Sequence, residues 1–188
     1  QYSVPKGEGG MLAVLGTKIN DIENILKDNE NNFKVEIAND NSDSQIILSG
    51  KKNDIDSVSN FLKDKKIKNI KLPVSAPFHS SLMSKATEIM KKELFNINFE
   101  NSKKILISNV TADEINNVND LKKLLIDNIE KKVRWRESIL NMVNKGVNQF
   151  IEIGPGKVLS GLIKRINVNK DIKISSINTQ SDIENLKI

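Results

Sequence analysis

The sequence lacks cysteine altogether and holds a single histidine among its 188 residues. Without cysteine the chain has no disulfide, no thiolate nucleophile and no cysteine-ligated metal. Aromatic residues amount to only 4%, too few to provide the base-stacking side chains of a single-strand nucleic-acid binder. No apolar run approaches the length of about 20 residues that a bilayer-spanning helix requires. We therefore predict no metal, no cofactor, no nucleic-acid partner, no membrane partner and a cytoplasmic location.

The composition is that of a globular protein with a basic surface. Hydrophobic residues make up 38% and charged residues 28%, which fits one domain or one domain with a small inserted subdomain. The net charge of +5 has two readings. It is typical of proteins with an acidic partner, but the abundance of Lys, Asn and Ile together also indicates an AT-rich genome, and we favour the second reading.

Periodicity over residues 11–74 predicts six elements in the order β-α-β-β-α-β. Strands are indicated by alternating or continuous apolar runs, and helices by apolar stripes at helical spacing. The strands are predicted over residues 11–16, 33–37, 45–50 and 67–74, with helices over 19–26 and 55–62 and a polar loop over 39–44. This order is that of the ferredoxin-like motif, in which two helices cover one face of a four-stranded antiparallel sheet.

After residue 75 strands and helices alternate, which predicts a parallel α/β sheet. Short apolar strands are expected over residues 105–108, 150–153 and 172–177, separated by helical stripes. The fold class predicted for the whole chain is therefore α/β.

The only histidine, His79, lies where an extended segment ends and an amphipathic helix begins. Histidine takes and gives protons near neutral pH, and α/β enzymes expose catalytic groups where strands end. His79 is thus the only candidate for histidine acid–base chemistry, although a structural histidine is the alternative. A serine partner on a nucleophile elbow needs the pentapeptide G-x-S-x-G, and residues 1–188 do not contain it.

Three further motifs admit a functional and a structural reading. The run Gly154-Pro155-Gly156-Lys157 stands between a predicted strand and a predicted helix, a place where backbone amides attract anions. A tight structural turn is favoured over an anion site, because the run lacks the residue spacing of a phosphate-binding loop. Trp135 is predicted to be a buried anchor and not a docking surface. Asn109 is either polar support for a site or a turn residue.

Four of these segments together resemble malonyl-CoA:acyl carrier protein transacylases. The run from Leu72 to Met83 is similar to the histidine motif of that family. Further family signatures are matched in order and spacing by Ile107–Thr111, Val133–Trp135 and Glu152–Leu159, and the resemblance runs from about Gly9 to Ile166.

The resemblance implies an architecture as well as an activity. It implies part of an α/β-hydrolase-like large subdomain with an inserted ferredoxin-like small subdomain. We expect residues 1–10 to be a linker from a missing N-terminal part, residues 11–74 the small subdomain and residues 75–188 the C-terminal part of the large one. The nucleophile elbow, an oxyanion-hole glutamine and a carboxylate-binding arginine are expected upstream. The chain alone is therefore expected to fold poorly and to be inactive, and the full-length protein to be a monomer.

The resemblance also implies a mechanism, in which a serine attacks the malonyl thioester and His79 takes its proton. A malonyl-serine ester forms, and the thiol of acyl carrier protein then attacks it. The family orients its histidine through a main-chain carbonyl, which corresponds to Asn128 here, where glutamine is more usual. Phe78 is expected to narrow the pocket against a 2-methyl branch. We assign Phe78, Asn128 and Asn109 to substrate binding.

The expected partners are malonyl-CoA and acyl carrier protein. Because carrier proteins are acidic, basic side chains are expected to speed the encounter, chiefly Lys157, Lys164 and Arg165, and less so Lys131 and Lys132. Two alternatives stay open: a trans-acting acyltransferase of a polyketide synthase, and a catalytically silent remnant that binds a carrier protein.

Overall fold

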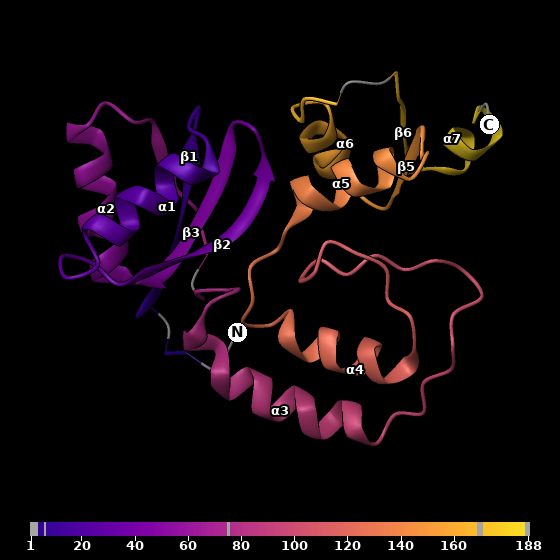
Figure 1. Cartoon of the computed structure of the whole chain (residues 1–188), viewed down its shortest axis with the longest axis horizontal. Coiled ribbons are helices and arrows are strands. Elements are labelled where there is room, and N and C mark those ends of the chain that lie inside the picture. Colours follow the sequence, from indigo (N-terminus) through magenta and orange to yellow (C-terminus); the bar gives the residue numbers. More distant parts are fainter. Residues whose placement is uncertain (1–3, 6, 75, 169–170, 187–188) are drawn as a thin grey trace.

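The computed structural model has an α/β fold and describes residues 4–5, 7–74, 76–168 and 171–186 (Figure 1). Ser75 of the histidine motif and Gln1 lie outside the described residues. Among the described residues, no helix combines the length and the apolar character needed to cross a bilayer.

The N-terminal unit is a four-stranded antiparallel sheet in the order β2-β3-β1-β4. Its two helices lie on one face of this sheet (Figure 1), as the sequence predicts. Its elements are β1 (Gly9–Leu15), α1 (Ile19–Asp28), β2 (Val35–Ser42), β3 (Gln45–Lys51), α2 (Lys52–Asp64) and β4 (Asn69–Lys71).

Alternation along β1 builds two cores, one on each face of this sheet. Leu12 and Val14 are fully buried against α1 and α2. Met11 and Ala13 point to the opposite face, where a smaller cluster forms. Successive strand side chains point to opposite faces, so a strand buried on both faces is apolar throughout.

Three predicted boundaries in this unit need correction. β1 begins at Gly9, which pairs with Lys51, so residues 9 and 10 belong to the sheet and not to a linker over residues 1–10. β2 extends to Ser42, through the polar segment predicted as a loop, because Asp40 and Ser42 are buried against distant parts of the chain. β4 is limited to Asn69–Lys71.

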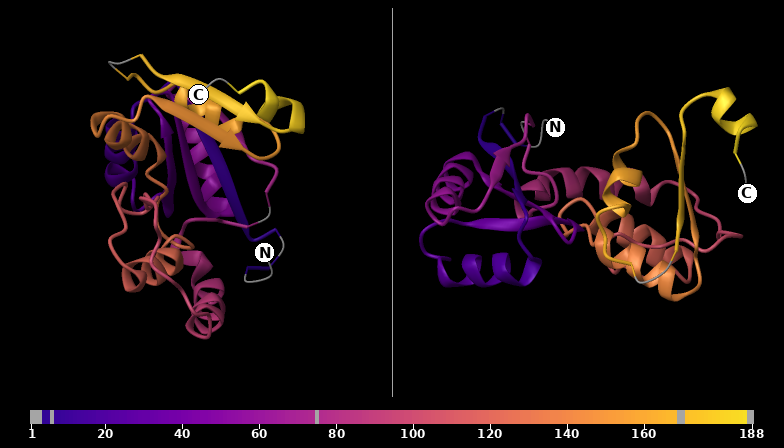
Figure 2. Two further views of the ribbon diagram at one scale, coloured as in Figure 1. Left: turned by 90° about the vertical axis from the view of Figure 1, so that its right-hand side faces the viewer. Right: turned by 90° about the horizontal axis from the view of Figure 1, so that it is seen from above.

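The rest of the chain carries a second, two-stranded sheet, in which β5 and β6 pair in parallel as predicted. Ile139, Val143, Ile163 and Ile166 form its adjacent core. Figure 2 shows this sheet apart from the four-stranded one. The elements are the 3₁₀ turn η1 (Ser81–Met83), α3 (Ser84–Phe95), α4 (Val118–Asp127), α5 (Trp135–Asn144), β5 (Gln149–Ile153), α6 (Val158–Ile163), β6 (Lys173–Ile177) and α7 (Gln180–Glu184).

The strand predicted over residues 105–108 is wrong. Only an isolated bridge joins Ile107 to Glu114, and Ser108 instead forms a turn whose hydroxyl accepts from the amide of Val110 at 3.1 Å. Serine hydroxyls commonly accept from a backbone amide two residues ahead, and the backbone amide of Ser108 donates across the same turn to the carbonyl of Asp113 at 2.8 Å.

Candidate functional site

His79 lies in a strained turn between β4 and η1. Its φ of 56° is in the left-handed region, which non-glycine residues rarely adopt. Ala76 and Pro77 before it and Ser80 after it are buried. Such strain persists only where surrounding contacts over-determine the conformation. We call residues 76–81 the histidine loop.

Contacts from both ends hold the histidine loop. Upstream, Pro77 packs directly on Gly9, so closely that a Cβ at Gly9 would overlap the proline ring. Inside the loop, the hydroxyl of Ser80 donates to the carbonyl of Pro77 at 2.7 Å. Downstream, Oε1 of Glu36 accepts from both the amide and the hydroxyl of Ser81, at 2.9 and 2.6 Å.

The imidazole of His79 is oriented by the main chain of Asn128. Nδ1 of His79 lies 2.7 Å from the carbonyl oxygen of Asn128. Because a carbonyl oxygen can only accept, Nδ1 carries the proton in this bond and Nε2 of the neutral ring is left with its lone pair. This is the contact that the sequence analysis expects, and it makes Nε2 a proton acceptor.

The side chain of Asn128 takes no part in that contact. Asn128 follows the last turn of α4, and its Oδ1 is buried without a hydrogen-bond partner. A buried, unpaired amide oxygen is destabilising by roughly 1–3 kcal/mol. The structure thus gives the backbone of Asn128 a role in orienting His79 and leaves its side-chain oxygen without a hydrogen-bond partner among the described residues.

The segment after Asn128 is fixed to the edge of the first sheet. The amide of Val133 donates to Ala38 at 2.8 Å, and the carbonyl of Val133 accepts from Asp40 at 2.9 Å. Register shifts in β2 on either side of Asn39 and Asp40 re-aim its side chains, as β-bulges do. The carboxylate of Asp40 is fully buried and accepts three hydrogen bonds from Nε and Nη2 of Arg136 on α5, at 2.8 to 3.1 Å.

A polar hollow of about 320 Å³ opens beside the histidine. Its walls come from α1, β2, the histidine loop and the segment after α4, through Glu23, Glu36, His79, Ser81, Lys131 and Lys132. Lys132 pairs with Glu23 at 3.5 Å across it. We call it the His79 hollow. A proton acceptor beside a hollow with both signs of charge suits a polar substrate.

The structure separates the other two predicted binding residues from this hollow. Phe78 is half-buried and packs on the apolar cluster of Met11, Ala13, Ala38 and Ile47. Asn109 is exposed, and only its carbonyl is tied to the region, accepting from the amide of Arg134 at 2.8 Å.

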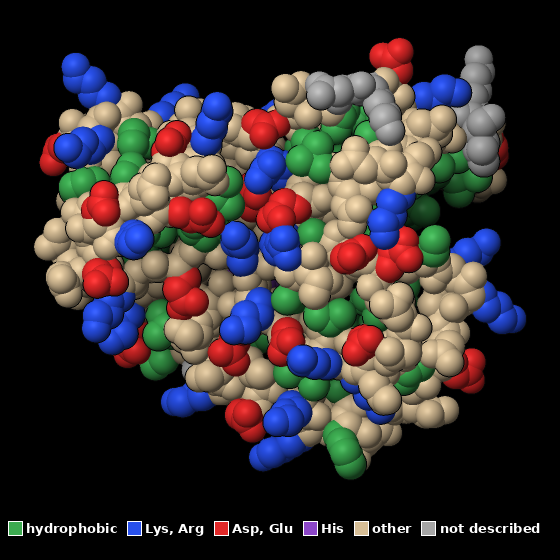
Figure 3. All heavy atoms as spheres, viewed as in Figure 1, with side chains coloured by type: hydrophobic (Ala, Val, Ile, Leu, Met, Phe, Trp, Pro, Cys, Tyr) green, Lys and Arg blue, Asp and Glu red, His purple; other side chains and the backbone are tan. Residues whose placement is uncertain are grey.

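The glycine-rich turn after β5 has its helix N-terminus occupied. Glu152 accepts from the amides of Leu159 and Ser160 at 3.0 and 2.7 Å, in the place where an anion would bind. The structural reading of residues 154–157 is therefore correct. Lys157, Lys164 and Arg165 around this turn are exposed. Figure 3 shows charges of both signs interspersed over the face it displays.

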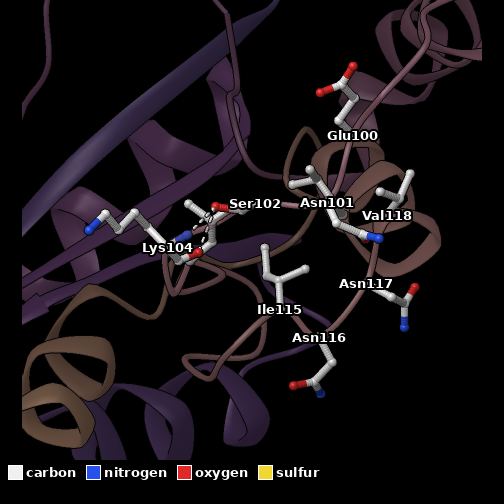
Figure 4. Close-up of a pocket in the computed structure, with 10 residues that line it drawn as sticks. Glu100, Asn101, Ser102, Lys104, Ile115, Asn116, Asn117 and Val118 are labelled. Carbon is white, nitrogen blue, oxygen red and sulfur yellow. Dashed lines mark hydrogen bonds between the residues drawn. The ribbon is translucent and has the colours of Figure 1, made fainter.

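A second hollow, of only about 50 Å³, lies between residues 100–106 and the start of α4 (Figure 4). Ser102 and Lys104 close one side of it through a bond of 2.6 Å between hydroxyl and carbonyl. Across the described ranges no three histidine, aspartate or glutamate side chains are grouped so that they could hold a metal ion.

Sequence reasoning misses two sets of residues that build this site. One is Glu36, which holds Ser81, and the other is the pair of Asp40 and Arg136. Each contact joins residues 45 or 96 positions apart, and no local pattern reveals such a pairing.

The family model of the acyl transferase domain matches residues 3–178. The chain belongs to the acyl transferase domain family. This acyl transferase chain is 39% identical over 184 residues to the malonyl CoA-acyl carrier protein transacylase of Bacillus subtilis, covering 97% of the chain and 57% of that relative. It is 37% identical to the enzyme of the same name from Staphylococcus aureus, covering 96% and 58%.

Solved structures of such proteins are similar to this acyl transferase chain. The malonyl CoA-acyl carrier protein transacylase of Clostridium perfringens matches with a TM-score of 0.92 at 36% identity, over 98% of this chain and 58% of that one. A malonyl-transacylase in complex with its type II PKS acyl-carrier protein matches with a TM-score of 0.90 at 29% identity, over 98% and 59%. The chain thus spans somewhat under three fifths of the length of these relatives.

Proposed function

We propose that this acyl transferase chain contributes the proton-transfer half of a malonyltransferase, moving malonyl from malonyl-CoA to the phosphopantetheine thiol of acyl carrier protein. The observation that carries the proposal is the bond from Nδ1 of His79 to the Asn128 carbonyl, which leaves Nε2 free to accept a proton. The names of the relatives supply the substrate and the acceptor. Fatty acid synthesis is the pathway in which this transfer is proposed to act.

Proton transfer proceeds in two matched steps. In the first, Nε2 takes the proton of a serine hydroxyl as the serine oxygen bonds to the thioester carbon. The carbon–sulfur bond breaks, and the imidazolium returns the proton to the leaving coenzyme A thiolate. In the second, the carrier-protein thiol loses its proton to Nε2, its sulfur bonds to the ester carbon, and the imidazolium returns the proton to the serine oxygen as the bond from that oxygen to the carbon breaks. Because residues 1–188 contain no G-x-S-x-G motif, the serine elbow is assigned outside them.

The finer architecture is part of the same proposal. Residues 11–74, extended by Gly9 and Gly10 of β1, would be the inserted ferredoxin-like small subdomain and residues 75–188 part of the α/β-hydrolase-like large one, with residues 1–8 leading in. The strand order β2-β3-β1-β4 and the parallel pairing of β5 with β6 support this division. We further propose a cytoplasmic monomer that takes no metal, no cofactor and no nucleic acid.

A second candidate is a malonyltransferase that serves a polyketide synthase. The similar malonyl-transacylase bound to a type II PKS acyl-carrier protein favours it. Transfer rates to purified fatty-acid and polyketide carrier proteins, measured side by side, decide between the two. A faster rate with the polyketide carrier supports the second candidate.

A chimera tests the proposal directly. It joins the part of the Bacillus subtilis relative outside the matched region to residues 1–188, and transfer of labelled malonyl to holo carrier protein is measured. We expect transfer by the chimera, its loss in His79→Ala, and no transfer by residues 1–188 alone. A folded chimera without transfer, or one indifferent to His79→Ala, contradicts the proposal.

A further inference from the structure

Glu36 differs from the other acidic residues of the His79 hollow in what it contacts. It stands on β2, and its Oε1 accepts two bonds from Ser81, the second residue after the histidine. Both donors of Ser81, its backbone amide and its hydroxyl, converge on this one carboxylate oxygen. Hydrogen bonds to an ionised acceptor are shorter and roughly twice as strong as neutral ones.

The histidine loop needs such a contact because its conformation is strained. The left-handed conformation is unfavourable for a residue with a Cβ, and here that residue is His79 itself. Pro77 against Gly9 fixes the loop only upstream of the histidine. Downstream, the two bonds from Ser81 to Glu36 oppose a change of the turn to an ordinary φ, and such a change would move the imidazole.

β2 also contacts the segment that follows the acceptor of the imidazole proton. Ala38 and Asp40 bond to Val133, five residues after Asn128. One strand therefore contacts the chain on both sides of the bond between His79 and Asn128: through Glu36 just after the histidine, and through Ala38 and Asp40 after the carbonyl.

We propose that Glu36 is a positioning residue, which holds the histidine loop through Ser81 so that Nδ1 of His79 stays bonded to the Asn128 carbonyl. Only the expected effect of Glu36 on catalysis rests on the proposed function. Its expected effect on the position of the imidazole does not. It assigns Glu36 no proton transfer and no substrate contact.

Nitrogen NMR of His79 in the chimera provides the first test. With ¹⁵N-histidine labelling, the ring signals of His79 are those that disappear in His79→Ala, and they are expected to show a protonated Nδ1 with slow proton exchange. Glu36→Ala is expected to speed that exchange about tenfold or more and to mix the two tautomers. Glu36→Gln keeps a side-chain oxygen that can accept both hydrogen bonds from Ser81. The Nδ1 proton is therefore expected to exchange nearly as slowly as in the wild type.

Ser81→Pro removes both donors at once with little change to the backbone. Proline is suited to the first position of a helical turn, and the extended Ser80 before it, with φ −141° and ψ 163°, tolerates a following proline. Ser81→Pro is expected to speed proton exchange at Nδ1 of His79 as much as Glu36→Ala does. The double variant is expected to exchange no faster than either single variant. The control is Glu23→Ala, which removes a charge from the same hollow without touching the loop.

The result that overturns the inference is a wild type without a protonated Nδ1, or a Glu36→Ala variant with unchanged exchange. Equal effects from Glu23→Ala and Glu36→Ala also overturn it, because they assign the effect to the charge of the hollow. In the chimera, Glu36→Ala is expected to lower kcat about tenfold with an unchanged KM for malonyl-CoA. An inactive chimera defeats the proposed function alone, since the NMR result does not depend on activity.

Discussion

At the scale of single residues, His79 combines a strained backbone with an oriented ring. The left-handed φ and the bond to Asn128 belong to the same residue. The sequence identifies His79 because it is the only histidine and stands at a strand end. It cannot identify Glu36, because a glutamate in an alternating strand is indistinguishable from any exposed strand residue until the fold places Ser81 against it.

Phe78→Ser tests the role assigned to the side chain before the histidine. Phe78 does not line the His79 hollow, and its role in the acyl pocket rests on the family resemblance alone. On that assignment we expect a smaller preference for malonyl-CoA over methylmalonyl-CoA, because one methyl group in an apolar pocket is worth roughly 1–3 kcal/mol. The ratio of kcat/KM for the two thioesters in the chimera measures it. Phe78 also packs on the cluster around Met11, so the substitution is expected to lower stability as well. For this reason only the ratio of the two kcat/KM values tests the role of Phe78 in selectivity. An unchanged ratio contradicts the assignment.

Asp40→Ala tests the buried ion pair. Removing one partner leaves the guanidinium of Arg136 without its charge partner, which costs about 3–5 kcal/mol of unfolding free energy. Urea denaturation of wild type and variant measures the loss. Asp56→Ala breaks an exposed pair with Lys71 and serves as control, with an expected loss below about 1 kcal/mol. Equal losses in the two variants would show that burial is irrelevant here.

At the scale of elements, the sequence predicts those whose pattern is local. β1, β3 and the two helices of the first sheet are recovered because their apolar residues repeat at the period of their own structure. The second half of β2 is not, since it contains the polar Asp40, which is fully buried and whose carboxylate is paired with Arg136 on α5, 96 residues away. The apolar run at residues 105–108 lacks a partner strand among the described residues, so composition alone misleads there.

The start of α5 gives a pH-dependent prediction. Arg134 donates to Glu137, and this hydrogen bond holds the pKa of the Glu137 carboxyl below its ordinary value of 4.5. A lowered folded pKa adds stability that is fully present above pH 4.5 and is lost as the pH falls through the folded pKa. Glu137→Gln is therefore expected to lower Tm at pH 7 and to lower it less below pH 4.5.

Melting curves at a series of pH values check the Glu137 prediction. The exposed Glu30, changed to Gln, is the control. A gap between wild type and Glu137→Gln that stays constant from pH 7 to pH 3 contradicts the role of the charged form.

At the scale of the whole molecule, the excess of positive charge has a proposed partner in an acidic carrier protein. Reversing the exposed Lys157, Lys164 and Arg165 to Glu in the chimera is expected to raise KM for carrier protein about tenfold at low salt. KM for malonyl-CoA is expected to stay constant. Reversal of Lys27 and Lys63 on the other unit is the control. A similar rise for both substrates contradicts a docking role.

The central claim is that His79 accepts the proton that acyl transfer releases. Rapid-quench mass measurement of the malonyl-enzyme ester in the chimera, with His79 and with His79→Ala, isolates that step. The account predicts that the ester forms about 10² to 10⁴ times more slowly in the variant. Ester formation at an equal rate in a variant of unchanged Tm would contradict it.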